Sequence, residues 1–248
     1  GCVSIVIVLG LIHALGMDPF HQLAPLHKED LHRFLSTIGN ITFFAHLITM
    51  TLPIAIFLFD DAEDFKHRIL YGGFILLAFC GIYISHVDSA YLGLIAILTY
   101  YFFHSVTSVQ ALKKLLVILF LGLAGIKLLV AVEQMGIAMY WDGISALLVH
   151  SPWVDLLLIA DVIFLWLLKR HAFMKQMHLH YLRLGAGIAV IGCFCVTVGA
   201  LIYFTWIRPD ISIGVWSSYL RLDDAWGSMR GFLWNALLPL FFSSFTLT

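Results

Sequence analysis

The sequence predicts an all-α fold, a polytopic bundle of about seven transmembrane helices, and three observations lead to this prediction. Hydrophobic residues make up 61% of the 248-residue chain, and charged residues make up only 12%. Soluble domains carry roughly 25% charged residues. The apolar runs are continuous and have the length of about 17–25 residues that a helix needs to cross the hydrocarbon core. A transmembrane barrel would instead show shorter segments of alternating polarity.

The predicted spans follow one another with mostly short polar links. Residues 3–16 form the end of a span, and the others cover residues 40–59, 69–86, 90–107, 115–132, 152–168 and 184–207. Asn40 stands where a helix N-cap belongs, and Pro53 is a candidate kink in the second span. We therefore assign residues 1–207 to the bundle and residues 208–248 to the start of a large extracytoplasmic loop.

The two ends of the chain are abrupt. Gly1 opens directly in an apolar run, without a basic leader region, and no closing span precedes Thr248. We expect the chain to be an internal piece of a longer protein.

The distribution of Lys and Arg predicts the orientation of the bundle. Eight basic residues lie in three short loops on one side, residues 60–68, 108–114 and 169–183. Five lie in the longer segments on the other side, which include residues 17–39 and 208–248. The densely basic side should face the cytoplasm, so the loops 17–39 and 208–248 are predicted to be extracytoplasmic. The net charge of −1 gives no general attraction for nucleic acid.

Three charged residues lie inside the predicted spans. A charge at the centre of a bilayer costs about 2.5–3.5 kcal/mol on insertion scales, so Lys127 should pair with Asp155 or Asp161 of the next span, or extend its amine to the interface. The two aspartates are six positions apart and therefore lie on different faces of one helix. Groups of this kind leave a proton or ion path open as an interpretation.

The remaining polar residues give no metal or cofactor site. Only His46, His86 and His104 lie near spans, and they do not form a pair at matched depth for haem. No cluster of His, Cys and Glu has the spacing of zinc ligands.

Arg33 and Arg230 form the more informative combination, because both lie on the predicted outer side. Two arginines can hold a diphosphate through bidentate, charge-assisted hydrogen bonds, and they would stabilise charge that develops as the diphosphate leaves. The alternative is that both anchor the chain at the membrane interface beside aromatic residues such as Trp234.

Three segments together resemble the O-antigen ligase/polymerase superfamily. Residues 33–45, RFLSTIGNITFFA, followed by Pro53, are similar to its "R…TxGNxNFxA…P" signature. Residues 86–93, HVDSAYLG, resemble the turn that follows one span later, and residues 223–234, DDAWGSMRGFLW, resemble the segment that opens the large outer loop. Thr42 replaces a usual second Asn, and Asp88 stands where many members have Arg.

The resemblance implies a GT-C-like glycosyltransferase of the inner membrane of bacteria, inverting and independent of metal. Its partners would be a glycan on undecaprenyl diphosphate, an acceptor hydroxyl on a glycan, lipid or protein, and the lipid bilayer. Carried onto this sequence, Arg230 and Arg33 would be the catalytic residues. The substrate-binding residues would be Asn40, Gly39, Asp88 and Trp234. No cofactor is implied.

Two other functions stay open on the residues alone. A transporter or flippase would use Lys127 and Asp161 in mid-bilayer, and a non-catalytic membrane scaffold would use neither.

Overall fold

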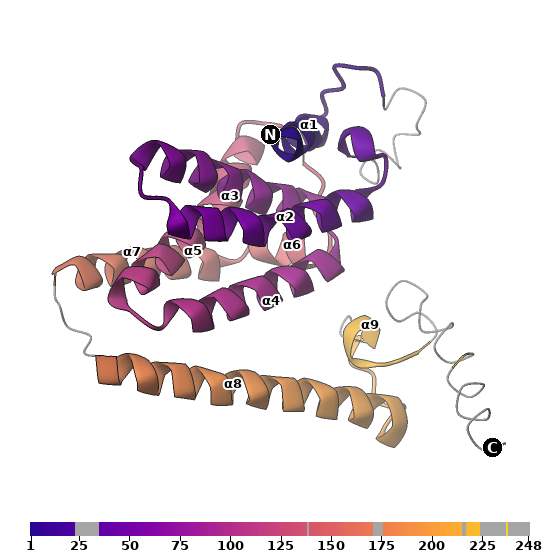
Figure 1. Cartoon of the computed structure of the whole chain (residues 1–248). Helices are drawn as coiled ribbons and strands as arrows, with labels where there is room; N and C mark the ends of the chain where they lie inside the picture. Colours follow the sequence, from indigo (N-terminus) through magenta and orange to yellow (C-terminus); the bar gives the residue numbers. More distant parts are fainter. Residues whose placement is uncertain (23–34, 138, 171–175, 215–216, 224–236, 238–248) are drawn as a thin grey trace, which may run out of the picture. The chain divides into compact units, whose positions relative to one another are not determined.

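A computed structural model of the chain describes residues 1–22, 35–137, 139–170, 176–214, 217–223 and 237 (Figure 1). All regular elements within these residues are helical, as the composition predicts. They are α1 (Cys2–Ala14), a 3-10 turn (Ser36–Ile38), α2 (Ile41–Asp61), α3 (Phe65–Ser85), α4 (Asp88–Ser105), α5 (Val109–Gln134), α6 (Gly143–Val149), α7 (Pro152–Arg170), α8 (Gln176–Ile202), a π-helical turn (Tyr203–Ile207) and α9 (Ser217–Leu220). The chain divides into two compact units, Gly1–His180 and Tyr181–Thr248.

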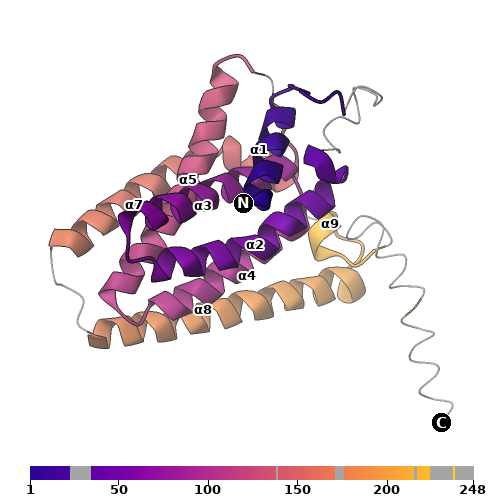
Figure 2. The same cartoon turned by 45° about the horizontal axis from the view of Figure 1, so that its top comes forward.

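The first unit is built around four helices. α2, α3, α5 and α4 contact one another in that cyclic order, which is the arrangement of a four-helix bundle (Figures 1 and 2). α1 adds to this bundle mainly on α3, and α7 adds to it on α5. The buried side chains of these helices form one continuous apolar core.

Local signals in the sequence set the limits of these helices. The side chain of Asn40 caps α2, and the hydroxyl of Ser108 caps α5 by accepting a hydrogen bond from the backbone N–H of Ala111 at 3.1 Å. α3 ends at His86, which adopts the left-handed conformation with φ 54°. This conformation closes the helix, so that α4 begins only two residues later.

Small residues let the helices approach closely. A Cβ atom on Gly81 of α3 would lie 2.6 Å from Ile48 Cδ1 of α2 and 3.2 Å from Ile7 Cγ2 of α1. A Cβ atom on Gly10 would lie 2.5 Å from the ring of Phe44. A larger residue at either position would require the facing side chain to move, so these two glycines favour the close packing of α1 and α2.

Four helices of the described chain are long and apolar enough to cross a membrane: α2, α3, α5 and the segment Leu179–Ile207. The pair α6 and α7 counts as a fifth if its 63° bend lies within one span. This confirms a helical chain with several candidate spans and supports a membrane protein. α1, with 13 residues, and the less apolar α4 do not meet the same test, so the count of seven spans stays a prediction.

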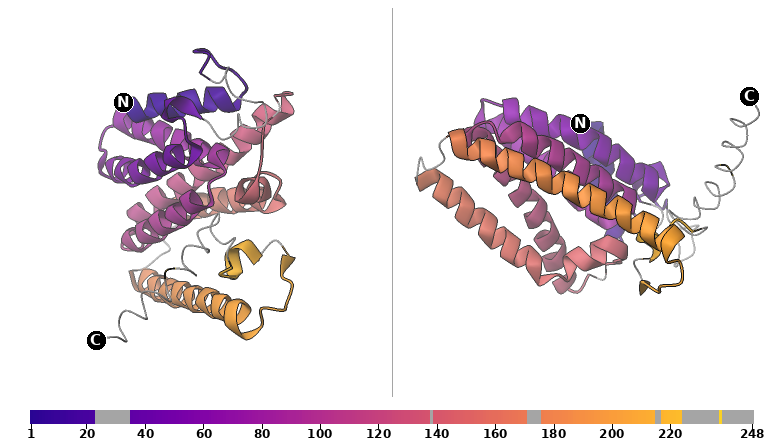
Figure 3. Two further views of the ribbon diagram at one scale, coloured as in Figure 1. Left: turned by 90° about the vertical axis from the view of Figure 1, so that its right-hand side faces the viewer. Right: turned by 90° about the horizontal axis from the view of Figure 1, so that it is seen from below.

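The second unit contains most of α8 and the segment that follows it (Figure 3). Apolar side chains of α8 such as Ile188 and Phe194 are exposed, as suits contact with lipid. After the π-helical turn, Arg221 donates hydrogen bonds to the backbone oxygens of Phe204 and Ile211, which holds the following loop against the helix end. This division into compact units does not test the assignment of residues 208–248 to an extracytoplasmic loop, which stays a prediction.

Candidate functional site

Two of the three segments that carry the family resemblance meet at one end of the first unit, where α2 and α4 begin. We call this region the Asn40 end. His46 Nε2 lies 2.9 Å from the hydroxyl of Ser89, which joins the first turns of α2 to the first turn of α4. The loop before α2 and the turn before α4 thus lie at the same end of the bundle, although they are some fifty residues apart in the chain.

Asn40 and Gly39 form the turn that opens α2. Gly39 has φ 67°, a conformation that favours glycine. Asn40 Oδ1 accepts hydrogen bonds from the backbone N–H groups of Thr42 at 2.8 Å and Phe43 at 3.2 Å. This confirms Asn40 as the N-cap. Because its oxygen is used by the cap, any contact of this side chain with a substrate would come from its amide nitrogen.

The chain just before this turn is anchored to α1. The backbone N–H of Ser36 donates to His13 Nδ1 at 3.1 Å, and the Ser36 hydroxyl donates to the backbone oxygen of Val6 at 2.7 Å. Ser36 has a positive φ of 63°, so these two bonds hold a backbone conformation that serine seldom adopts. They hold the chain just before the Gly39–Asn40 turn against α1.

Asp88 lies in the first turn of α4, beside the start of α6. Its Oδ1 atom is 3.4 Å from the position of a Cβ on Gly143. The neighbouring His86 packs edge-on against Tyr140 and Trp141, with ring centroids 5.4 and 5.8 Å apart. The segment before α6 therefore covers the turn that carries Asp88.

A hydroxyl chain that the sequence analysis missed lies beneath Asp88. The Ser145 hydroxyl donates to the backbone oxygen of Tyr83 at 2.8 Å, and it lies 2.7 Å from the Tyr91 hydroxyl. Since a serine hydroxyl has one hydrogen, Tyr91 is the donor to Ser145. A single Ser or Tyr in an apolar run gives little signal in sequence, so only the packing identifies this chain.

Arg33, Arg230 and Trp234 lie outside the described residues. Of the five basic residues on the predicted outer side, Arg208 and Arg221 are described. Arg208 forms a fork on Asp210 with distances of 3.1 and 3.2 Å. These hydrogen bonds hold the pKa of the Asp210 carboxyl below its ordinary value.

The opposite end of the bundle gathers two of the basic loops. Lys114 Nζ lies 3.1 Å from Asp60 Oδ1, and the Tyr101 hydroxyl donates to the same oxygen at 3.1 Å. Residues 60–68 and 108–114, predicted as loops but mostly part of α2, α3 and α5 in the structure, therefore lie at one end, as the alternation of spans predicts. Whether this end faces the cytoplasm stays a prediction.

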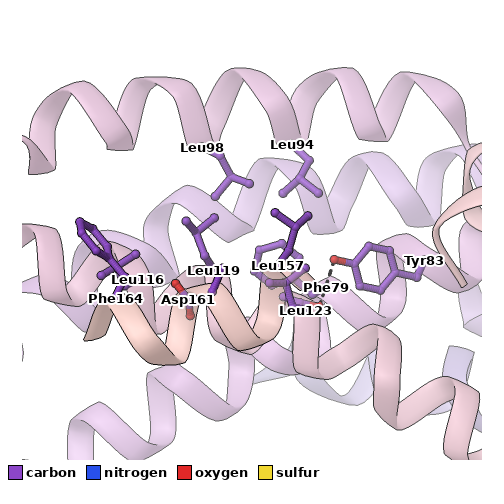
Figure 4. A pocket seen from close by; sticks show the side chains of 12 residues that line it. Phe79, Tyr83, Leu94, Leu98, Leu116, Leu119, Leu123, Leu157, Asp161 and Phe164 are labelled. Atoms are coloured by element: carbon purple, nitrogen blue, oxygen red, sulfur yellow. Dashed lines mark hydrogen bonds between the residues drawn. The ribbon is translucent and has the colours of Figure 1, made fainter. Parts of the chain in front are cut away.

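Of the three charged residues in the predicted spans, two form an ion pair. Lys127 Nζ lies 2.7 Å from Asp155 Oδ1, between α5 and α7. Asp161, six residues further along α7, points to another face, as the spacing predicts, and is 8% exposed. It lines a pocket of about 540 Å³ between α3, α4, α5 and α7 (Figure 4).

Among the described residues, no group of three or more His, Cys, Asp or Glu side chains is arranged to hold a metal ion. Comparison of the chain with protein-family models, with curated proteins and with solved structures finds no match.

Proposed function

We propose that the chain transfers a glycan from undecaprenyl diphosphate to an acceptor hydroxyl at the outer face of the bacterial inner membrane, as an O-antigen ligase or polymerase does. The proposal rests on the resemblance of three segments to that superfamily. One structural observation supports it: the His46–Ser89 contact brings the Gly39–Asn40 turn and the Asp88 turn to one end of the bundle. The predicted loop with Arg230 would have to reach the same end.

In this reaction the acceptor oxygen attacks the anomeric carbon, the bond from that carbon to the diphosphate breaks, and the acceptor proton passes to a base. Diphosphate is a good leaving group, so the protein mainly has to place cations on it. Arg230 and Arg33 are proposed for this role, with Asn40 and Gly39 shaping the turn beside them. The base is not identified; His32, Asp223 and Asp224, which neighbour Arg33 and Arg230 in the sequence, are available for this role.

The test measures binding of the leaving group, because this requires no knowledge of the glycan. The full chain is prepared in lipid nanodiscs, and native mass spectrometry compares bound undecaprenyl diphosphate with undecaprenyl monophosphate. We expect a preference for the diphosphate that falls at least tenfold in Arg230→Lys, which keeps the charge but loses the bidentate fork. Arg208→Lys is the matched control, since Arg208 pairs with Asp210.

Equal binding of the two lipids to the unaltered chain would contradict the proposal. If Arg230→Lys keeps the full preference for the diphosphate lipid, the chain binds the diphosphate but Arg230 is not the residue that holds it.

The main alternative is a transporter that uses Lys127 and Asp161. The ion pair with Asp155 already neutralises Lys127, which favours a structural role for this lysine. Substitution of Lys127 or Asp161 by leucine separates the two functions. A transporter would lose its activity, whereas a transferase would lose folding yield and keep the diphosphate preference in the protein that folds. A non-catalytic scaffold would show no such preference at all.

A further inference from the structure

The pocket between α3, α4, α5 and α7 contains a buried carboxyl group for which the proposed transferase has no use. Ten of its twelve lining residues are apolar or glycine, and they include Leu94 and Leu98 of α4 and Leu116 of α5. The other two are Tyr83 and Asp161 (Figure 4). Its volume of about 540 Å³ lies within the range of roughly 300–1,000 Å³ that is typical of small-molecule sites.

The two polar groups of the pocket differ in how they are satisfied. The Tyr83 hydroxyl donates to the backbone oxygen of Gly122 at 3.1 Å. Asp161 Oδ2 is fully buried, and no described residue donates a hydrogen bond to it. An ionised carboxylate without a partner in such surroundings costs several kcal/mol.

The lysine in the middle of the adjacent helix α5 does not supply the missing partner. Lys127 of α5 forms its ion pair with Asp155, at 2.7 Å. Asp161 is therefore the buried carboxyl group of this helix pair for which the described residues supply no cation. A ligand that brings one would satisfy it.

We infer that this pocket binds an amphiphile with an apolar body and one protonated amine, which pairs with the carboxylate of Asp161. The apolar lining takes up the hydrocarbon part, and the hydroxyl of Tyr83 offers a second acceptor for the N–H groups. This site contains none of the residues proposed to bind the diphosphate or the glycan, and it contacts the hydroxyl chain beneath Asp88 through Tyr83, whose backbone oxygen accepts a hydrogen bond from Ser145.

The probe is tritium-labelled decylamine, with decanol as the neutral match of the same chain length. The full chain in phosphatidylcholine nanodiscs is dialysed to equilibrium against each probe, and empty nanodiscs give the partition into lipid. We expect one saturable site for the amine per chain and at least tenfold weaker binding of the alcohol.

Two variants locate the site. Asp161→Asn, which keeps the shape of the side chain, should lower the affinity for decylamine at least tenfold and leave that for decanol unchanged. Glu133→Gln, on the adjacent helix α5 and outside the pocket lining, is the matched control and should change the affinity for decylamine less than twofold. Ala160→Phe, which fills the pocket, should remove saturable binding of both probes.

A second measurement uses the unaltered chain and does not depend on a variant folding. Dicyclohexylcarbodiimide, a lipophilic carboxyl reagent, should label Asp161, as read by mass spectrometry of peptides. N,N-dimethyldecylamine, a tertiary amine that cannot capture the activated carboxyl as an amide, should protect Asp161 where decanol does not. The inference is overturned if amine and alcohol bind equally, if no saturable site exists, or if the tertiary amine gives Asp161 no protection.

Discussion

The close approach of three helices at Gly81 allows a quantitative test of the packing. In Gly81→Ala the new Cβ would lie 2.6 Å from Ile48 Cδ1, and both neighbouring isoleucines are fully buried. Carbon atoms in good contact lie about 3.5–4.0 Å apart, so the Ile48 methyl must move by about 1 Å in a filled core. Overpacking of this kind costs about 1–3 kcal/mol.

Gly73 in the same helix supplies the reference, because a Cβ there has no neighbour within 4 Å. Both substitutions gain the same helix propensity, up to about 1 kcal/mol. The difference in free energy of unfolding between Gly81→Ala and Gly73→Ala therefore isolates the overpacking, and we expect Gly81→Ala to be less stable by about 1–3 kcal/mol. Unfolding by sodium dodecyl sulfate in mixed micelles, followed by circular dichroism, measures it.

The double variant Gly81→Ala/Ile48→Val tests the stated cause, since Ile48→Val removes the one atom that lies closest. Ile48→Val alone should cost about 0.5–1.5 kcal/mol. The loss of stability in the double variant should be smaller than the sum of the losses in the two single variants. If Gly81→Ala is as stable as Gly73→Ala, or if the two costs are additive, α1 and α2 do not pack on α3 as described.

Three further predictions follow from the contacts above. Asn40→Ala should lower the free energy of unfolding by about 0.5–2 kcal/mol, and Asn40→Asp should not; equal losses would rule out capping as the cause. Lys127→Met should reduce folding yield in the membrane because it leaves Asp155 unpaired, and Lys127→Met/Asp155→Leu should restore it; gel filtration of the solubilised protein reads both. The pKa of Asp210 is lowered in the folded chain by its contact with Arg208. This contact therefore stabilises the fold fully above the unfolded pKa of about 3.9, and the stabilisation is lost as the pH falls through the lower pKa of the folded chain. Arg208→Gln should return the pKa of Asp210 towards its ordinary value in a carbon-13 NMR titration, and an unchanged titration would exclude Arg208 as the cause.

The lengths and ends of helices were largely predictable from the sequence. The span predicted at residues 40–59 is observed as Ile41–Asp61, because an apolar run and the Asn40 cap are both local signals. The span predicted at residues 115–132 is longer in the structure, Val109–Gln134, since polar residues at its ends continue the helix beyond the apolar run. Hydrophobicity marks the part of a helix that suits the bilayer rather than its full length.

The site was predictable only in part. The separation of Asp155 from Asp161 follows from helical spacing, but the choice of Asp155 as the partner of Lys127 depends on how α5 and α7 pack. The pocket around Asp161 likewise needs four helices to be placed, and apolar residues on a membrane helix do not reveal which of them face a cavity.

The ion pair between α5 and α7 has a consequence for the order of events during synthesis. Asp155 follows Lys127 by 28 positions in the chain. At a translation rate of about 5–20 residues per second, Asp155 is therefore synthesised roughly one to six seconds after Lys127. Within residues 115–132, α5 carries thirteen Leu, Ile, Val and Phe residues. Together these favour insertion by about 4–8 kcal/mol, against a cost of about 2.5–3.5 kcal/mol for the lysine. On this balance α5 can enter the bilayer before α7 is made. The ion pair between Lys127 and Asp155 can then form within the membrane and favour the packing of α7 against α5.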